Sequence, residues 1–153
     1  MPEDEPFEVV TENGVAAGNT LIVGQPTPGM AGVTAVDYLI RESETDRLGH
    51  VVPGDLPAIA PFEDGVPRHH SRLYAMADAD VSVLFEELFV PPGAARGYVD
   101  AVVERASEAG VGEVAVLHGV PYPHAPEEHD VFYVATAEYR DRRATKTLAH
   151  DEG

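Results

Sequence analysis

The chain has 153 residues, 44% of them hydrophobic, which is enough for one domain with a real core and too few for two ordinary domains. Its 27 acidic and 10 basic residues give a formal net charge of -17, which argues against a nucleic-acid-binding surface and against an anionic membrane as partner. Cysteine is absent, so disulfides, thiolate nucleophiles and zinc–thiolate sites are excluded.

The basic residues are nine arginines and a single lysine, Lys146. Such an acidic, lysine-poor chain is typical of halophilic proteins, because dense surface carboxylates keep a protein soluble where high salt screens their repulsion. The first residues, MPEDEPFEVV, lack a basic region followed by an apolar stretch, and no later stretch has the length of a membrane span. The sequence therefore predicts a cytoplasmic, halophilic protein.

The first third of the chain predicts two strands and a helix. Residues 1–6 are expected to form a flexible acidic arm, and the β-branched stretches 7–11 and 20–24 to form strands, with the turn signal Asn13-Gly14 favouring a hairpin. Prolines and glycines end the second strand. Apolar residues then recur at helical spacing, namely Val33, Val36, Leu39 and Ile40.

The middle of the chain predicts strands at 48–52 and 80–84 with a hairpin insertion over residues 58–76 between them. Asp64-Gly65 marks the turn of that hairpin, whose later strand would carry His69, His70, Arg72 and Tyr74. A helix over 94–109 is expected to end at Gly110. Its apolar stripe consists of Ala95, Val99, Val102, Val103 and Ala106.

The last third predicts strands at 113–117 and 131–135, and the remainder is polar. Alternation of helices with apolar strands indicates an α/β fold with a largely parallel central sheet, in which 20–24, 80–84 and 113–117 are the central strands. We expect a single α/β domain over 7–143 and a polar tail over 144–153. Ligands and partners are expected at the carboxyl ends of the central strands.

The turn GQPTPGMAG lies between a strand and a helix, where backbone N–H groups favour an anion. It lacks the GK[ST] ending of nucleotide-binding loops and the GxGxxG spacing. The alternative is a tight turn that lets the helix pack closely on the sheet. Its candidate ligand or partner residues are Gly24, Gln25, Pro28, Gly29 and Gly32.

The loop HGVPYPHAPEEH over 118–129 holds three histidines that could provide a zinc site, with Glu127 or Glu128 as base. Its three prolines instead favour an extended, rigid loop that spreads the imidazole rings. We predict no metal site, no cofactor and no catalytic residue. The candidate ligand or partner residues here are His118, Gly119, Pro121, His124 and His129.

Two segments resemble the proteasome assembly chaperone family. They are TLIVGQPTPGMAGVTAVDYLI at 20–40 and VAVLHGVPYPHAPEEHDVFYVAT at 114–136, with LFEELFVPPG between them, and the resemblance covers residues 7–140. It implies a three-layer α/β/α sandwich similar to nucleoside phosphorylases, self-association, and a role in assembling or capping the proteasome α-ring. Family chains continue further, and archaeal members tend to end in a hydrophobic residue, tyrosine and one more residue. We therefore expect a C-terminally truncated member.

The resemblance predicts a non-enzymatic, proteasome-assembly-chaperone-like protein that acts through protein–protein association. The expected partners are further copies of the chain and proteasome α subunits. The alternative is a phosphorylase-like enzyme or a protein that binds a nucleoside or phosphate. Apolar side chains expected at the interface are Phe85, Leu88, Phe89, Val90, Phe132 and Tyr133.

Overall fold

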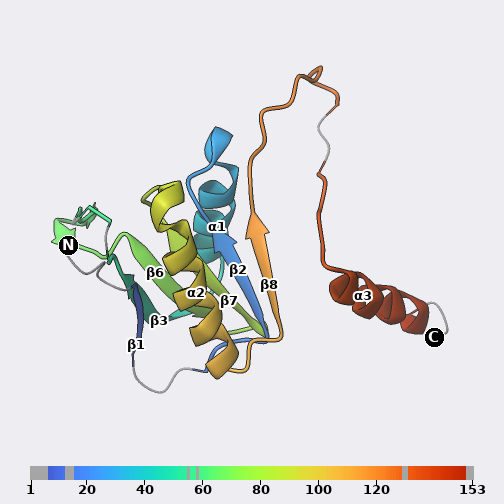
Figure 1. Cartoon of the computed structure of the whole chain (residues 1–153), viewed down its shortest axis with the longest axis horizontal. Helices are drawn as coiled ribbons and strands as arrows, with labels where there is room; N and C mark the ends of the chain where they lie inside the picture. Colours follow the sequence, from blue (N-terminus) through green and yellow to red (C-terminus); the bar gives the residue numbers. More distant parts are fainter. Residues whose placement is uncertain (1–6, 13–15, 55, 58, 129–130, 151–153) are drawn as a thin grey trace. The chain divides into compact units, whose positions relative to one another are not determined.

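The computed structural model describes residues 7–12, 16–54, 56–57, 59–128 and 131–150, with side chains up to residue 144 (Figure 1). Contacts divide the chain into two compact units, residues 1–121 and 122–153. The segment 122–143, which the sequence assigns to the main domain, thus groups with the C-terminal residues. Within the described part, no helix has the length and hydrophobicity that crossing a membrane requires.

A six-stranded sheet forms the centre of the first unit. In sheet order its strands are β1 (Glu8–Thr11), β3 (Thr45–Val52), β6 (Ser71–Met76), β7 (Val81–Glu86), β2 (Thr20–Gly24) and β8 (Glu113–Leu117). The single-turn helix η1 (Pro28–Met30) and helix α1 (Ala31–Glu42) follow β2, and helix α2 (Pro92–Glu108) follows β7. Pro92 begins α2 and Gly110 follows its end with a φ of 76°, which confirms the predicted helix stop.

The sheet is mixed, so the prediction of a largely parallel sheet is wrong. Only β7–β2 and β2–β8 are parallel, whereas β1–β3, β3–β6 and β6–β7 are antiparallel. Residues 77–80 alone join β6 to β7, and so short a connection permits only an antiparallel pair. The predicted hairpin of the first two strands is also wrong, because β1 pairs with β3; its turn signal lies outside the described residues.

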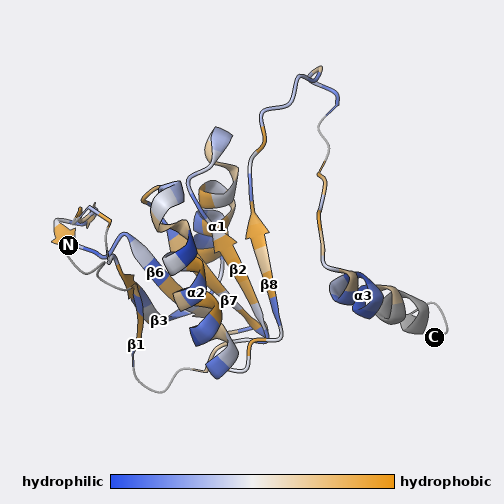
Figure 2. Ribbon diagram, viewed as in Figure 1, coloured by the Kyte–Doolittle hydropathy of each residue, from blue (hydrophilic) through white to orange (hydrophobic). Residues whose placement is uncertain are grey.

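One helix covers each face of the sheet, which makes three layers. Side chains of β2, β3 and β7 pack under α2, where the helix contributes Tyr98, Val102 and Ala106. On the opposite face Val83 and Phe85 pack against Val36 of α1. Successive strand residues alternate between these faces, as the pleat requires. Figure 2 shows hydrophobic residues along β2 and β8, while α2 carries hydrophilic residues as well.

The hairpin insertion is smaller than predicted. Strands β4 (Phe62–Glu63) and β5 (Val66–Pro67) pair through a turn at Asp64 and Gly65, whose φ values are 51° and 78°. Positive φ at both central residues is the geometry that the Asp-Gly signal predicts. The strand β6 that follows belongs to the central sheet, and His69 and His70 precede it.

The second unit departs most from the sequence prediction. Residues 131–136 form no strand, and the helix α3 (Ala137–His150) occupies most of the segment expected to be a polar tail. Val131 and Val134 are fully exposed. A β-strand needs a partner for its backbone hydrogen bonds, and strand-forming residues alone do not supply one.

Candidate functional site

Three loops meet at one edge of the sheet because β2, β7 and β8 run parallel. They are residues 25–31, 87–91 and 118–121, at the upper end of these strands in Figure 1. We call this the carboxyl edge. The first of these loops is the turn that the sequence singled out, and residues 118–121 are the start of the second, predicted over 118–129, whose residues 122–128 belong to the second unit.

Close backbone approach holds the first and third loops together. The backbone N–H of Gly119 donates to the Thr27 hydroxyl at 3.0 Å. A Cβ atom at Gly119 would collide with the carbonyl oxygen of Pro28, and one at Gly32 with that of Leu117. Gly24 is equally crowded by α1. Gly24 and Gly32 therefore allow tight packing of α1 and the neighbouring loop, as the tight-turn alternative predicts, whereas a Cβ at Gly29 would meet no atom.

Replacing Gly119 by alanine is expected to lower the free energy of unfolding by about 1–3 kcal/mol, because the methyl group must displace backbone atoms. Gly93→Ala is the matched control, since its Cβ would meet no atom within 4 Å. We expect the control to change stability by less than about 1 kcal/mol. Urea midpoints that are equal for the two variants would refute the close contact.

The carboxyl edge exposes apolar side chains from all three loops. Met30 is 46% exposed, Phe89 61% and Val120 72%. Met30 and the preceding Gly29 both have positive φ, at 55° and 75°, so the turn holds Met30 in a conformation that non-glycine residues seldom adopt. Leu88 and Val90 flank Phe89 and are half-buried.

Phe85 is not part of this surface. It is 7% exposed and packs in the core on the α1 side of the sheet, so its predicted place in an interface is wrong for this chain. Its ring lies 5.0 Å from the Arg72 guanidinium. Phe132 and Tyr133 belong to the second unit, where both side chains are exposed.

The histidines of the 118–129 loop are exposed where they are described. His118 follows β8, and in the second unit the Nδ1 atom of His124 lies 3.0 Å from the carbonyl oxygen of Ala125. His129 lies outside the described residues. Among the residues with a described position, no three histidine, aspartate or glutamate side chains are grouped to hold a metal ion.

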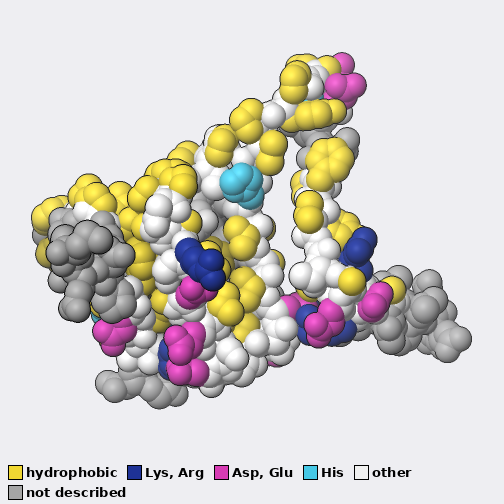
Figure 3. Space-filling view, in the orientation of Figure 1, with side chains coloured by type: hydrophobic (Ala, Val, Ile, Leu, Met, Phe, Trp, Pro, Cys, Tyr) yellow, Lys and Arg dark blue, Asp and Glu magenta, His cyan; other side chains and the backbone are white. Residues whose placement is uncertain are grey.

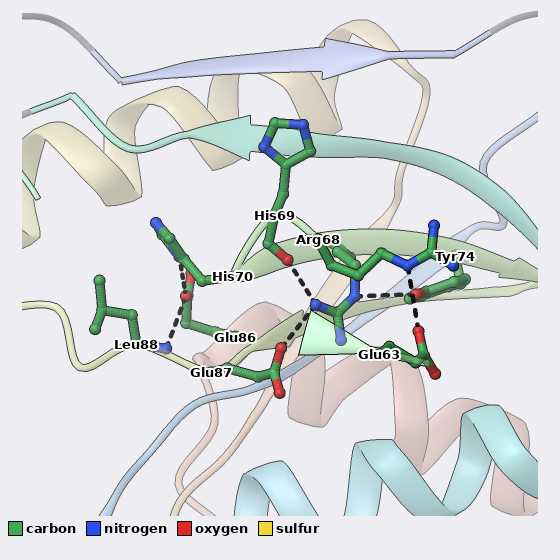
Figure 4. A network of polar contacts seen from close by, with 9 residues as sticks. Glu63, Arg68, His69, His70, Tyr74, Glu86, Glu87 and Leu88 are labelled. Atoms are coloured by element: carbon green, nitrogen blue, oxygen red, sulfur yellow. Dashed lines mark hydrogen bonds and ion pairs between the residues drawn. The ribbon is translucent and has the colours of Figure 1, made fainter. Parts of the chain in front are cut away.

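A buried polar network supports the loop that carries Phe89, and the sequence did not reveal it. Glu86, at the end of β7, is fully buried. Its carboxylate accepts hydrogen bonds from the Tyr98 hydroxyl at 3.0 Å and from the Leu88 backbone N–H at 3.2 Å. The Nδ1 atom of His70 lies 3.0 Å from the same carboxylate (Figure 4). The network thus joins the start of β6, the end of β7 and α2.

Burial raises the pKa of Tyr98 well above its ordinary value, and the neighbouring Glu86 carboxylate raises it further. The phenol therefore stays neutral and remains a hydrogen-bond donor at any working pH. The position of Glu86 in the sequence could have revealed this network. Glu86 ends a strand buried on both faces, so its carboxylate had to lie inside the fold.

A second set of contacts fixes the start of the same loop. Arg72, 7% exposed, pairs with Glu87 at 2.7 Å and donates from Nε to the Tyr74 hydroxyl at 3.1 Å. Figure 4 shows His69 and His70 directed to different sides, as expected for consecutive residues in an extended segment. The rings of His69 and His50 are stacked, with centroids 3.6 Å apart.

Stability is expected to fall as the pH drops below about 6.5, the ordinary histidine value. Partial burial lowers the pKa of His69, and His50 and then Arg47 lower it further, while Glu12 opposes them. The unfolded chain then binds a proton that the folded chain resists, so this stabilisation is complete above the ordinary pKa and is lost below it. Urea midpoints from pH 7 to pH 5 should decline less in His69→Gln; an identical decline would contradict the assignment.

Known proteins resemble this chain in sequence and in fold. A family model described as the PAC2 family matches residues 21–152. A search of functionally curated proteins finds no match. A protein of unknown function from Thermoplasma acidophilum superposes with a TM-score of 0.74 at 23% identity, over 86% of this chain and 54% of that one.

Two structures from Pyrococcus furiosus are also similar. PbaA, described as an archaeal homolog of proteasome-assembly chaperone, has a TM-score of 0.61 at 21% identity, over 72% of this chain and 47% of its own. PbaB, described as an archaeal proteasome activator, has a TM-score of 0.64 at 16% identity, over 79% of this chain and 54% of its own. The chain thus spans about half the length of these structures, and at such identities the likeness shows a shared fold. The family model covers most of the sequence, so the chain belongs to the PAC2 family, and the resemblance to proteasome assembly chaperones predicted from the sequence is confirmed.

Proposed function

We propose that this protein is a non-enzymatic, proteasome-assembly-chaperone-like protein that acts by binding other proteins, among them further copies of itself. Membership of the PAC2 family supports the proposal. So does a fold shared with PbaA and PbaB, the first described as a homolog of proteasome-assembly chaperone and the second as a proteasome activator.

The observation that carries the proposal is the apolar carboxyl edge. Met30, Phe89 and Val120 project from three separate loops that hydrogen bonds, close glycine contacts and a buried carboxylate hold in place. Apolar and aromatic side chains on a pre-organised surface are the usual anchors of protein interfaces, because little conformational entropy is lost on binding. We infer that proteasome α subunits are the partner of this surface.

The test is to mix the purified chain with recombinant archaeal proteasome α subunits and to follow sedimentation. We expect the 16.4 kDa chain to move into the α-subunit boundary, and to remain free when proteasome β subunits replace them. Free sedimentation with both subunits would count against the proposed partner. An equal shift with both would show adhesion without specificity.

The layered arrangement supports the finer proposal that the fold is phosphorylase-like. The parallel strands β2 and β7 are neighbours, and the helices that follow them, α1 and α2, cover opposite faces of the sheet. The carboxyl ends of two such strands often form a ligand-binding crevice. Here Glu86, at the carboxyl end of β7, is buried and accepts a hydrogen bond from the buried Tyr98 hydroxyl. A thermal-shift screen separates ligand binding from the non-enzymatic function, since a nucleoside or phosphate at a hundred times its dissociation constant adds about 2.7 kcal/mol.

We further propose a cytoplasmic, halophilic setting on the basis of the charge of -17. The melting temperature is expected to rise between 0.01 M and 1 M salt, because the Debye length falls from about 30 Å to about 3 Å and self-repulsion is screened. Differential scanning fluorimetry over this range is sufficient. A flat or falling melting temperature would remove the halophilic part of the proposal.

A further inference from the structure

The strand β8 lies at an open edge of the sheet. In the described part of the chain it pairs with β2 alone, so one row of its backbone groups has no strand beside it. Residues 114–117 include no charge and no proline, the usual means of blocking such an edge. Val114 is 43% exposed and Val116 56% exposed.

Apolar exposure continues from this edge onto α2. Leu21 and Val23, the partners of Val114 and Val116 in β2, pack under α2, so the two exposed valines lie on the α2 face of the sheet. Val99 and Val103, one turn apart on α2, are each 51% exposed. Figure 3 shows hydrophobic side chains on the surface beside α2. An open edge beside such a patch is a template for an added strand.

The same chain carries a segment of strand-forming residues that has no strand to pair with in its own unit. Val131, Phe132, Tyr133 and Val134 are between 75% and 103% exposed, and residues 131–136 form no strand. β-Branched and aromatic residues in succession are what a pleated, half-buried strand prefers. Figure 3 shows their part of the chain as largely hydrophobic. The sequence is that of a strand, but the segment has no neighbouring strand within its own unit.

We propose that the segment Val131–Ala135 of a second copy adds to the free edge of β8, and that two copies exchange these segments reciprocally. The inference rests on the self-association in the proposed function and names its surfaces. Residues 114–117 and 131–135 are uncharged, and Glu113 at the start of β8 accepts a hydrogen bond from the Thr20 hydroxyl of β2, so a chain of net charge -17 brings few carboxylates into the contact. Alternate residues of the added strand are apolar on either face, whichever register forms.

Two observations favour a second copy as the occupant. The residues that follow β8 turn towards the loop after β2, where the Gly119 N–H donates to the Thr27 hydroxyl, so residues 118 and 119 do not cover the free edge. Reciprocal exchange also buries enough area. An aromatic side chain buries about 150–250 Å², so Phe132 and Tyr133 of two copies contribute on the order of 600–1,000 Å² before the valines are added. Specific interfaces begin near about 1,000 Å² in total.

Light scattering after size exclusion of the whole chain, in about 1 M salt to screen repulsion, tests the inference. We expect a dimer of about twice 16.4 kDa. Val116→Lys on β8 and Val134→Pro in the segment should each give a monomer, because one blocks the edge and the other removes a donor from the added strand. Tyr38→Lys on α1, at a side chain that is 63% exposed, should remain a dimer.

Mixing the two monomeric variants is the decisive step. The Val134→Pro chain keeps an intact edge and the Val116→Lys chain keeps an intact segment, so their mixture should form a heterodimer through one contact, weaker than the unmodified dimer because it buries half the area. A dimer that survives Val134→Pro would show pairing by other surfaces and overturn the inference. So would a monomeric unmodified chain, or a mixture that shows no heterodimer even at the highest protein concentration. No proteasome component is present, so these failures leave the test of α-subunit binding unaffected.

Discussion

Replacing Glu86 by alanine is expected to lower the free energy of unfolding by about 3–5 kcal/mol. The fully buried carboxylate accepts hydrogen bonds from Tyr98 and Leu88 and lies beside His70. Alanine leaves these buried groups without their acceptor and also leaves a cavity, and both effects destabilise the folded state. Domains of this size are stable by about 5–15 kcal/mol, so the loss is a large share of the total.

Two companion variants give this prediction its controls. Tyr98→Phe removes one hydrogen bond and keeps the ring, so we expect a loss of about 1–3 kcal/mol. Glu104→Ala, at an exposed position of α2, should change stability by less than about 0.5 kcal/mol. Urea unfolding, followed by circular dichroism, ranks the three variants by their free energy of unfolding. If Glu86→Ala unfolds at the same urea concentration as Glu104→Ala, the network does not stabilise the fold.

Phe85→Asp and Phe89→Asp are expected to behave in opposite ways, although the two phenylalanines lie four residues apart. Phe85 is 7% exposed in the core, so aspartate there loses about 3–5 kcal/mol of packing and must also bury a carboxylate. We expect that chain to be largely unfolded. Phe89 is 61% exposed, and its replacement should change stability by less than about 0.5 kcal/mol.

The pair is read by circular dichroism and urea unfolding at 1 M salt. The expected result is a cooperative transition for Phe89→Asp that overlays that of the unmodified chain, and no cooperative transition for Phe85→Asp. A folded Phe85→Asp chain would place Phe85 at the surface, where the sequence-based hypothesis had it. An unfolded Phe89→Asp chain would mean that the loop after β7 is part of the core.

Much of the first unit could be predicted from local patterns. The strands 20–24 and 113–117 have the predicted bounds, and the helix expected over 94–109 spans 92–108. Each of these segments is long, strongly apolar on one side or both, and bounded by glycine or proline. The Asp-Gly turn was equally informative, because two-residue hairpin turns with positive φ at both central residues strongly favour such a pair.

Strand direction and strand partners could not be predicted in the same way. The alternation of helices and strands suggested parallel pairing, but the short connection at 77–80 and the pairing of β1 with β3 depend on the whole topology. The stretch 131–135 shows the same limit. Its residues favour a strand, yet a strand forms only where another strand supplies hydrogen bonds.

The candidate site was predicted in outline. Proline and glycine patterns located the 24–32 and 118–129 loops, and the parallel strands bring residues 25–31 and 118–121 to one edge. Composition gave no hint of the Glu86 network, because in a chain with 27 acidic residues one more carboxylate carries no information. Only the burial of the whole strand β7 distinguishes Glu86 from the others.

Binding of proteasome α subunits by Phe89→Asp and by the control Tyr38→Asp tests the central claim most directly. Both side chains are more than 60% exposed, at 61% and 63%, but only Phe89 lies on the carboxyl edge. Titration calorimetry at 1 M salt should show a loss of about 2 kcal/mol or more for Phe89→Asp, roughly thirtyfold in affinity, and no change for Tyr38→Asp. Equal affinity of the two variants and the unmodified chain would contradict the claim that the carboxyl edge is the partner-binding surface.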